Sequence, residues 1–207
     1  AACELAAFLL SQREHTGVGL PHRGRVVLES VVEDETLPTQ RVICHTLWGG
    51  GLNYPLSLLL GAALEAQLSL EAQLTAENDA ILIELPRETK DGPAASPLEA
   101  VAAALNAVPE TLEAMVRALR GRLEQSGFFA MSFRENAGRA LLLPKAGFDR
   151  RMPLWITRRR SRRLLNAASR FRDFPIAVET WRSCIHDSFD LDALSRRLRG
   201  ADYDEAE

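Results

Sequence analysis

The spacing of apolar residues changes partway along the chain, and this change limits the folds available to it. Before residue 87, short segments rich in β-branched residues alternate apolar and polar side chains, the repeat of a strand with one buried face. After residue 97, apolar residues recur at helical intervals, and the polar stretch 87–97 separates the two patterns. We therefore predict an α+β fold, with a β-rich N-terminal half (hairpins plus a helix) packed with a helical C-terminal half.

Two hairpins and a helix are expected in the first half. Segments 25–33 and 41–48 flank a polar turn and predict one hairpin, and 70–86 predicts a second, with a helix for its first half as the alternative. Between them, Gly49-Gly50-Gly51 predicts a flexible loop. Asn53 is then predicted to cap a helix that ends near residue 69 and has Pro55 in its first turn.

Helices dominate the expected second half. Ser96 and Glu99 have the spacing of a capping box, and a following helix is predicted from about Pro109 to Gly127. Further helices are predicted near 128–142, 155–171, 177–187 and 190–199. The predicted organisation is an N-terminal helix continuing from an upstream domain (1–19), a β-rich subdomain (20–86), a linker (87–97), a helical subdomain (98–200) and a frayed acidic tail (201–207).

The net charge of −3 conceals a strong local imbalance. Residues 1–127 carry 9 basic and 17 acidic side chains, residues 128–172 carry 12 basic and 2 acidic ones, and residues 173–207 carry 4 basic and 9 acidic ones. A segment of net charge +10 within an acidic chain indicates a surface that binds a polyanion.

The densest part of this segment lies at the start of a predicted helix. Helical spacing places Arg159, Arg162 and Arg163 on one face, with Arg158 beside Arg162. The arrangement opposes the helix dipole and brings like charges together, which favours a bound polyanion or an acidic partner. We predict that nucleic-acid phosphates and bases are bound by Arg150, Arg151, Arg158, Arg159, Arg162, Arg163 and Trp155. The alternatives are a solvated arginine face and a protein-docking surface.

The sequence contains none of the common catalytic or metal-binding motifs. It lacks a phosphate-binding P-loop, and its three cysteines and four histidines have no ligand spacing, so no catalytic residue or metal is expected. The cysteines fit buried packing in a reducing cytosol, no segment predicts a membrane span, and a cytoplasmic location is expected.

Five stretches, in order along residues 20–199, resemble the DEAD/DEAH-associated C-terminal region of the Lhr (large helicase-related) family. They are LPHRGRVVLE (20–29), HTLWGGGLNYPLSLLL (45–60), ENDAILIELP (77–86), SGFFAMSFRENAGRALLLP (126–144) and FPIAVETWRSCIHDSFDLDAL (174–194). Leu56 stands where the family often has an aromatic residue. The resemblance also draws attention to residues with an interdomain or structural role, namely His45, Trp48, Arg134, Glu135, Asn136 and Arg139.

The resemblance implies a longer parent protein, an ATP-dependent 3′-to-5′ DNA helicase associated with DNA repair. ATP and Mg²⁺ would bind in its RecA-like motor domains, which lie upstream with a winged-helix domain, so this fragment is expected to hold no cofactor and to have no enzymatic activity alone. The expected partners are single-stranded DNA or an RNA:DNA hybrid, and the upstream domains. The alternative is a scaffold whose basic face binds the ATPase domains or another repair protein and not DNA.

Overall fold

The computed structural model describes residues 2–22, 24–31, 38–68, 72–89, 92–93, 96–143, 153–171, 173–200 and 202–206. The chain forms two compact units, one of residues 1–119 and 191–207 (the sheet unit) and one of residues 120–190 (the helical unit). Strands belong to the first unit and helices dominate the second, so the predicted α+β class is confirmed.

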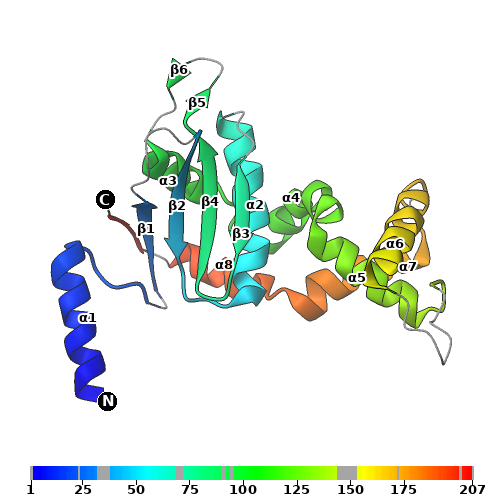
Figure 1. Ribbon diagram of the computed structural model, residues 1–207, viewed down its shortest axis with the longest axis horizontal. Coiled ribbons are helices and arrows are strands. Elements are labelled where there is room, and N and C mark those ends of the chain that lie inside the picture. Colours follow the sequence, from blue (N-terminus) through cyan, green and yellow to red (C-terminus); the bar gives the residue numbers. More distant parts are fainter. Residues whose placement is uncertain are drawn as a thin grey trace. The chain divides into compact units, whose positions relative to one another are not determined.

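A five-stranded sheet forms the centre of the sheet unit, in the order β3-β4-β2-β1-β7 (Figure 1). Both predicted hairpins are present, the first as β1 (Arg25–Val31) with β2 (Thr39–His45) and the second as β3 (Gln73–Ala76) with β4 (Ala80–Pro86). Leu28 pairs with Cys44, which pairs with Ile81, so these three buried residues share one face.

Helices α2 (Gly50–Leu68) and α3 (Pro97–Asn106) pack against this sheet, and α8 (Leu191–Arg199) packs on α2. Helix α2 contributes a fully or almost fully buried leucine row to the core, made of Leu56, Leu59, Leu60 and Leu64. Helix α1 (Ala2–Thr16) differs, since none of its residues is buried.

The predicted loop and helix cap at residues 49–53 are wrong. Helix α2 begins at Gly50, and Gly49, with φ of 85°, makes the turn that leads into it. Asn53 lies inside the helix, fully buried, where its Oδ1 accepts a hydrogen bond from Thr46 Oγ1 at 2.7 Å. Its Nδ2 donates to the carbonyls of Glu77 and Asn78 at 2.8 and 3.0 Å. The side chain therefore ties the helix to the β3–β4 turn instead of capping it, and Pro55 is the sixth helical residue.

The acidic tail is also a correction. It forms strand β7 (Asp202–Ala206), which pairs in parallel with β1, because backbone hydrogen bonding to an open sheet edge outweighs the tail's polar composition. In the expected linker, β5 (Glu88–Thr89) pairs with β6 (Gly92–Pro93).

The compact units differ from the predicted subdomains 20–86 and 98–200. Helices α3 and α8 belong with the sheet, and the division falls within α4 (Leu112–Gln125). The reason is that α3 buries Val101 and Ala104 against the sheet unit, so the helical pattern after residue 97 does not mark a new compact unit. Ser96 makes no capping hydrogen bond through its side chain, so the predicted capping box does not form.

Helix α5 (Gly127–Arg139) is central to the helical unit and contacts α6 (Leu154–Ala168), α7 (Pro175–Arg182) and the π-helix η1 (Ser183–Ser188). The Ser126 hydroxyl caps α5 by accepting from the Phe129 amide at 3.1 Å. The core between α5, α6 and α7 is small, with Phe133, Ala137, Leu143 and Ala168 at its centre.

The cysteines are all unpaired, and two of the three are buried as predicted. Burial raises the pKa of the Cys44 thiol to about 12 and also raises the pKa of Cys184. Cys3, on α1, is exposed, so the expectation of burial is wrong for it. None of the described helices is long and apolar enough to cross a membrane.

Candidate nucleic-acid interface

The basic surface predicted from sequence lies on α6. This helix follows Pro153 and has neither a side-chain cap nor an acidic residue in its first turn. Its apolar residues Leu164, Leu165 and Ala168 pack into the core of the helical unit. Packing of this side of α6 leaves the arginines of the opposite sides exposed, as the helical spacing predicted.

A pocket of about 550 Å³ opens between α5 and α6. We call it the arginine pocket, and its lining residues are Gly127, Ala130, Met131, Arg134, Trp155, Arg158, Arg159, Ser161, Arg162 and Leu165. Each helix contributes one face with the spacing i, i+3, i+4, i+7: Gly127 to Arg134 on α5, and Trp155 to Arg162 on α6. The pocket therefore follows directly from the packing of two regular helices.

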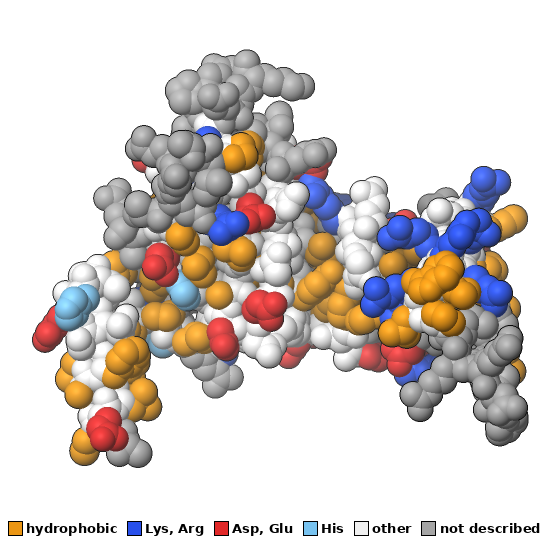
Figure 2. Space-filling model, in the orientation of Figure 1, with side chains coloured by type: hydrophobic (Ala, Val, Ile, Leu, Met, Phe, Trp, Pro, Cys, Tyr) orange, Lys and Arg blue, Asp and Glu red, His pale blue; other side chains and the backbone are white. Residues whose placement is uncertain are grey.

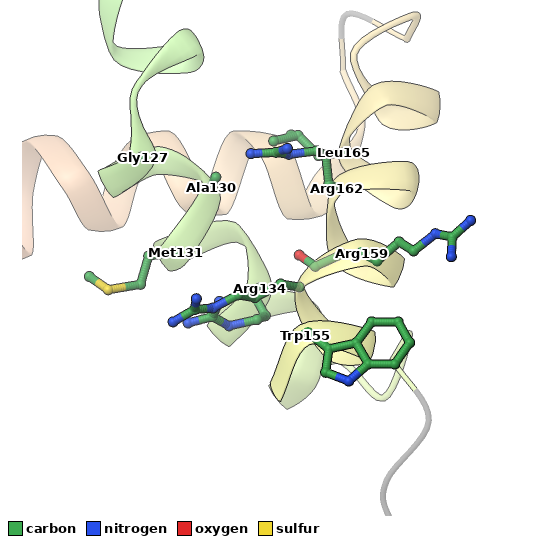
Figure 3. A pocket seen from close by; sticks show the side chains of 10 residues that line it. Gly127, Ala130, Met131, Arg134, Trp155, Arg159, Arg162 and Leu165 are labelled. Atoms are coloured by element: carbon green, nitrogen blue, oxygen red, sulfur yellow. The ribbon is translucent and has the colours of Figure 1, made fainter. Parts of the chain in front are cut away.

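The side chains of the pocket extend in two directions (Figure 3). Arg162 of α6 reaches toward α5, on which Arg134 and Met131 lie, whereas Trp155 and Arg159 extend away from α5 at the edge of the pocket. Figure 2 shows the same region as an apolar patch surrounded by basic side chains. The pocket thus combines an aromatic surface with positive charge.

The charge of the arginine pocket is not neutralised by the described part of the chain. Its lining includes four guanidinium groups, on Arg134, Arg158, Arg159 and Arg162, and no carboxylate. None of the four makes an ion pair or a hydrogen bond with its side chain to another described residue. Unpaired arginines that lie close together repel one another, and a bound anion relieves that repulsion.

The structure brings together four of the seven residues predicted to bind nucleic acid: Trp155, Arg158, Arg159 and Arg162 line the pocket. Arg163 is exposed on α6 but does not line it. Arg150 and Arg151 lie outside the described residues.

The aromatic residues near the arginines have different roles. Trp155 is 62% exposed, with its ring available at the pocket, and Phe171 is exposed but lies outside the lining. Trp181 is a packing residue, because its Nε1 donates to Glu124 at 2.8 Å and its ring meets the edge of Phe129. Only Trp155 of these three therefore offers a surface for stacking within the pocket.

The polar segment 134–139 of α5 divides between three roles. Asn136 is buried and its Nδ2 donates to the hydroxyls of Thr180 and Ser183 at 3.3 and 3.4 Å, which is an internal network. Glu135 and Arg139 form an exposed ion pair at 2.7 Å. Arg134 lines the arginine pocket, a role that sequence reasoning missed. The signal for it is that Arg134 follows Met131 by three residues, so both lie on the same face of α5.

The sequence also marked residues of the sheet unit. His45 donates from Nε2 to Glu29 at 2.8 Å, across neighbouring strands. Trp48 is half-buried, and its Nε1 is buried without a hydrogen-bond partner among the described residues. Leu56 is fully buried, so its side chain cannot contact a DNA strand. No group of potential metal ligands gathers among the residues that the structure describes.

Comparison with known proteins identifies relatives of the whole chain. The chain is 36% identical over 203 residues to "Lhr helicase/ probable uracil glycosylase" of Mycolicibacterium smegmatis, with 94% of this chain and 13% of the relative covered. It is 34% identical over 188 residues to "Lhr helicase/uracil glycosylase" of Escherichia coli, covering 91% of this chain and 11% of that protein. The chain therefore spans only about an eighth of the length of these relatives.

A solved structure has the same fold. It is the Mycobacterium smegmatis helicase Lhr bound to ssDNA and AMP-PNP, with a TM-score of 0.73 and 32% identity over 95% of this chain and 24% of that one. Residues 20–206 also match the family described as DEAD/H associated. The match covers most of the sequence and agrees with both relatives, so the chain belongs to the DEAD/H associated family.

Proposed function

We propose that this chain is the accessory domain of an ATP-dependent 3′-to-5′ DNA helicase of the Lhr type. In this proposal the arginine pocket contacts single-stranded DNA, and the domain braces the motor domains of the same protein. ATP and Mg²⁺ bind in those motor domains, and the chain itself performs no chemistry. An RNA:DNA hybrid as second substrate, a place in DNA repair and a cytoplasmic location belong to the same proposal.

One observation carries the DNA contact: four unpaired guanidinium groups and an exposed indole line a single pocket. Arginine matches phosphate geometry with its planar fork, and single strands are held by basic grooves whose aromatic residues stack on bases. The similar Lhr structure, which is bound to ssDNA, supports the choice of single-stranded DNA as the polyanion.

A protein-docking role is the second candidate. Exposed apolar residues surround the arginines, among them Met131, Leu154 and Phe171, at 47%, 72% and 66% exposure. Arginine and aromatic residues are also enriched where proteins bind each other. The relatives' names include uracil glycosylase, but we propose no such activity for this chain, because the pocket lining contains neither a carboxylate nor a histidine.

The test compares two triple variants of the 207-residue chain for binding to fluorescent single-stranded oligo-dT at low salt. The pocket triple replaces Arg134, Arg159 and Arg162 by Ala. The control triple replaces Arg117, Arg120 and Arg139 by Ala, which removes the same charge from exposed positions outside the pocket.

We expect the pocket triple to lose at least about tenfold in affinity, since each charged hydrogen bond contributes on the order of 1 kcal/mol at an exposed site. The control triple should change the affinity much less. Equal losses in both triples, or no detectable binding by the unaltered chain, contradict the DNA-contact proposal. Tight binding of the chain to the separately expressed motor domains, in the absence of DNA affinity, supports the docking role instead.

A further inference from the structure

We infer that the arginine pocket holds one unstacked base of the strand against Trp155 and favours guanine over adenine at that place. This inference rests on the proposed function and adds a preference that single-strand binding alone does not require. Three features of the pocket carry it: its size, the free face of Trp155 and the chemistry of its lining.

The first two features suit a single nucleotide. A volume of about 550 Å³ lies within the range of sites that bind small molecules and nucleotides. The Trp155 ring is 62% exposed and makes no ring contact with another described residue. An aromatic face left open beside positive charge is the arrangement on which a base stacks.

The positions of the arginines suit two different contacts, one with the base and one with the phosphate. Arg159 follows Trp155 by one helical turn and extends, like Trp155, away from α5 (Figure 3). A base stacked on the indole would present its edge to Arg159. Arg162 extends toward α5, on which Arg134 lies, and these two are placed to hold the adjoining phosphate.

The lining presents almost only hydrogen-bond donors. Apart from the Ser161 hydroxyl and the weakly accepting Met131 sulfur, its polar groups are four guanidinium groups and the Trp155 indole N–H, which donate and cannot accept. The carbonyls of α5 and α6 largely accept from their own helix amides. Guanine presents two acceptors, O6 and N7, to an arginine fork, whereas adenine replaces O6 with an amino donor that faces the guanidinium unfavourably.

Guanine and adenine are a matched pair, because both are purines with similar stacking area. We would measure the affinity of the 207-residue chain for single strands of about 12 nucleotides, a length within the usual site size. The strands are repeats of TTG, TTA or TT-inosine, together with oligo-dT. Isolated purines between thymines let the pocket select any register, and inosine keeps O6 and N7 while lacking the guanine amino group.

We expect TTG and TT-inosine repeats to bind about fivefold more tightly than TTA repeats, the lower end of a bidentate arginine contact at an open site. Arg159→Lys keeps the charge and loses the fork, so it should lower the affinity for TTG repeats to that for TTA repeats. Arg163→Lys, at an exposed position outside the pocket, is the matched control and should keep the preference.

The contact at Trp155 can be measured separately, by the fluorescence of its indole ring. Bound DNA should quench its fluorescence in the unaltered chain. Trp155→Ala should weaken binding to every strand by at least about fivefold, and Trp155→Phe should retain binding but lose most of the quenching. Equal affinity for TTG and TTA repeats, or full affinity in Trp155→Ala, overturns the inference. If the pocket triple still lowers oligo-dT affinity in that case, the proposed DNA contact stands without it; absence of all binding removes both.

Discussion

The two units of this chain have opposite charge and different cores. Counted from the sequence, the sheet unit carries 10 basic and 21 acidic side chains, a net charge of −11, while the helical unit carries 15 basic and 7 acidic ones, a net charge of +8. A single-sign surface attracts a polyanion, and an acidic body keeps that polyanion from binding elsewhere. The difference in charge favours the helical unit as the place of the proposed DNA contact.

The cores of the two units differ in the number of large side chains that they bury. The sheet unit buries a row of leucines from α2, which packs against strands β3 and β4. Among the described residues, the helical unit buries fewer large side chains, with Phe129 and Phe133 the largest, and Phe133 packs with Ala137, Leu143 and Ala168. A unit with few large buried residues depends more on each of them.

The largest expected effect comes from Phe133. Phe133→Ala removes a fully buried ring and should cost the helical unit about 3–5 kcal/mol of unfolding free energy. Chemical denaturation followed by circular dichroism measures this loss. Trp155→Ala, which removes an exposed ring from the same unit, is the control and should stay within about 0.5 kcal/mol of the parent. A loss below about 1 kcal/mol for Phe133→Ala would show that the core is not where the structure places it.

The next effect compares two buried amides, one in each unit. Asn53 makes three hydrogen bonds of 2.7–3.0 Å, whereas Asn136 makes two long ones of 3.3 and 3.4 Å. We expect Asn53→Ala to cost about 2–3 kcal/mol and Asn136→Ala about 1 kcal/mol, because the first change removes three short hydrogen bonds and the second removes two long, weak ones. Denaturant midpoints of both variants provide the test, and the reverse order would contradict the proposed roles of the two networks.

The smallest effect concerns Arg182, which donates to Glu179 and Asp187 where α7 continues into η1. The hydrogen bond from Arg182 lowers the pKa of Glu179, so the contribution to stability is present above the ordinary glutamate pKa and is lost as the pH falls through the lowered one. Arg182→Gln should therefore lower Tm slightly at neutral pH. The difference should vanish in acid, and a difference that persists there would assign the effect to packing.

Sequence periodicity predicted both hairpins and most helices, because each exposes one face and buries another. Periodicity gave wrong predictions where contacts between segments distant in the sequence determine the structure. Asn53 has the local signature of a helix cap, yet its partners Thr46 and Glu77 come from other segments. The tail forms β7 only because the edge of β1 is available. For the site, the arginines of α6 were evident as a charge cluster, whereas the contribution of Arg134 depends on how α5 packs beside α6.

We propose that the helical unit contacts DNA phosphates through the arginine pocket, and the salt dependence of binding tests this contact most directly. For single strands, the slope of log affinity against log salt is about −0.7 for each phosphate neutralised. Replacing Arg134, Arg159 and Arg162 by Ala should therefore reduce the magnitude of the slope by about 2, while the control triple at Arg117, Arg120 and Arg139 leaves it nearly unchanged. A slope that is the same in the pocket triple and the unaltered chain would contradict the claim.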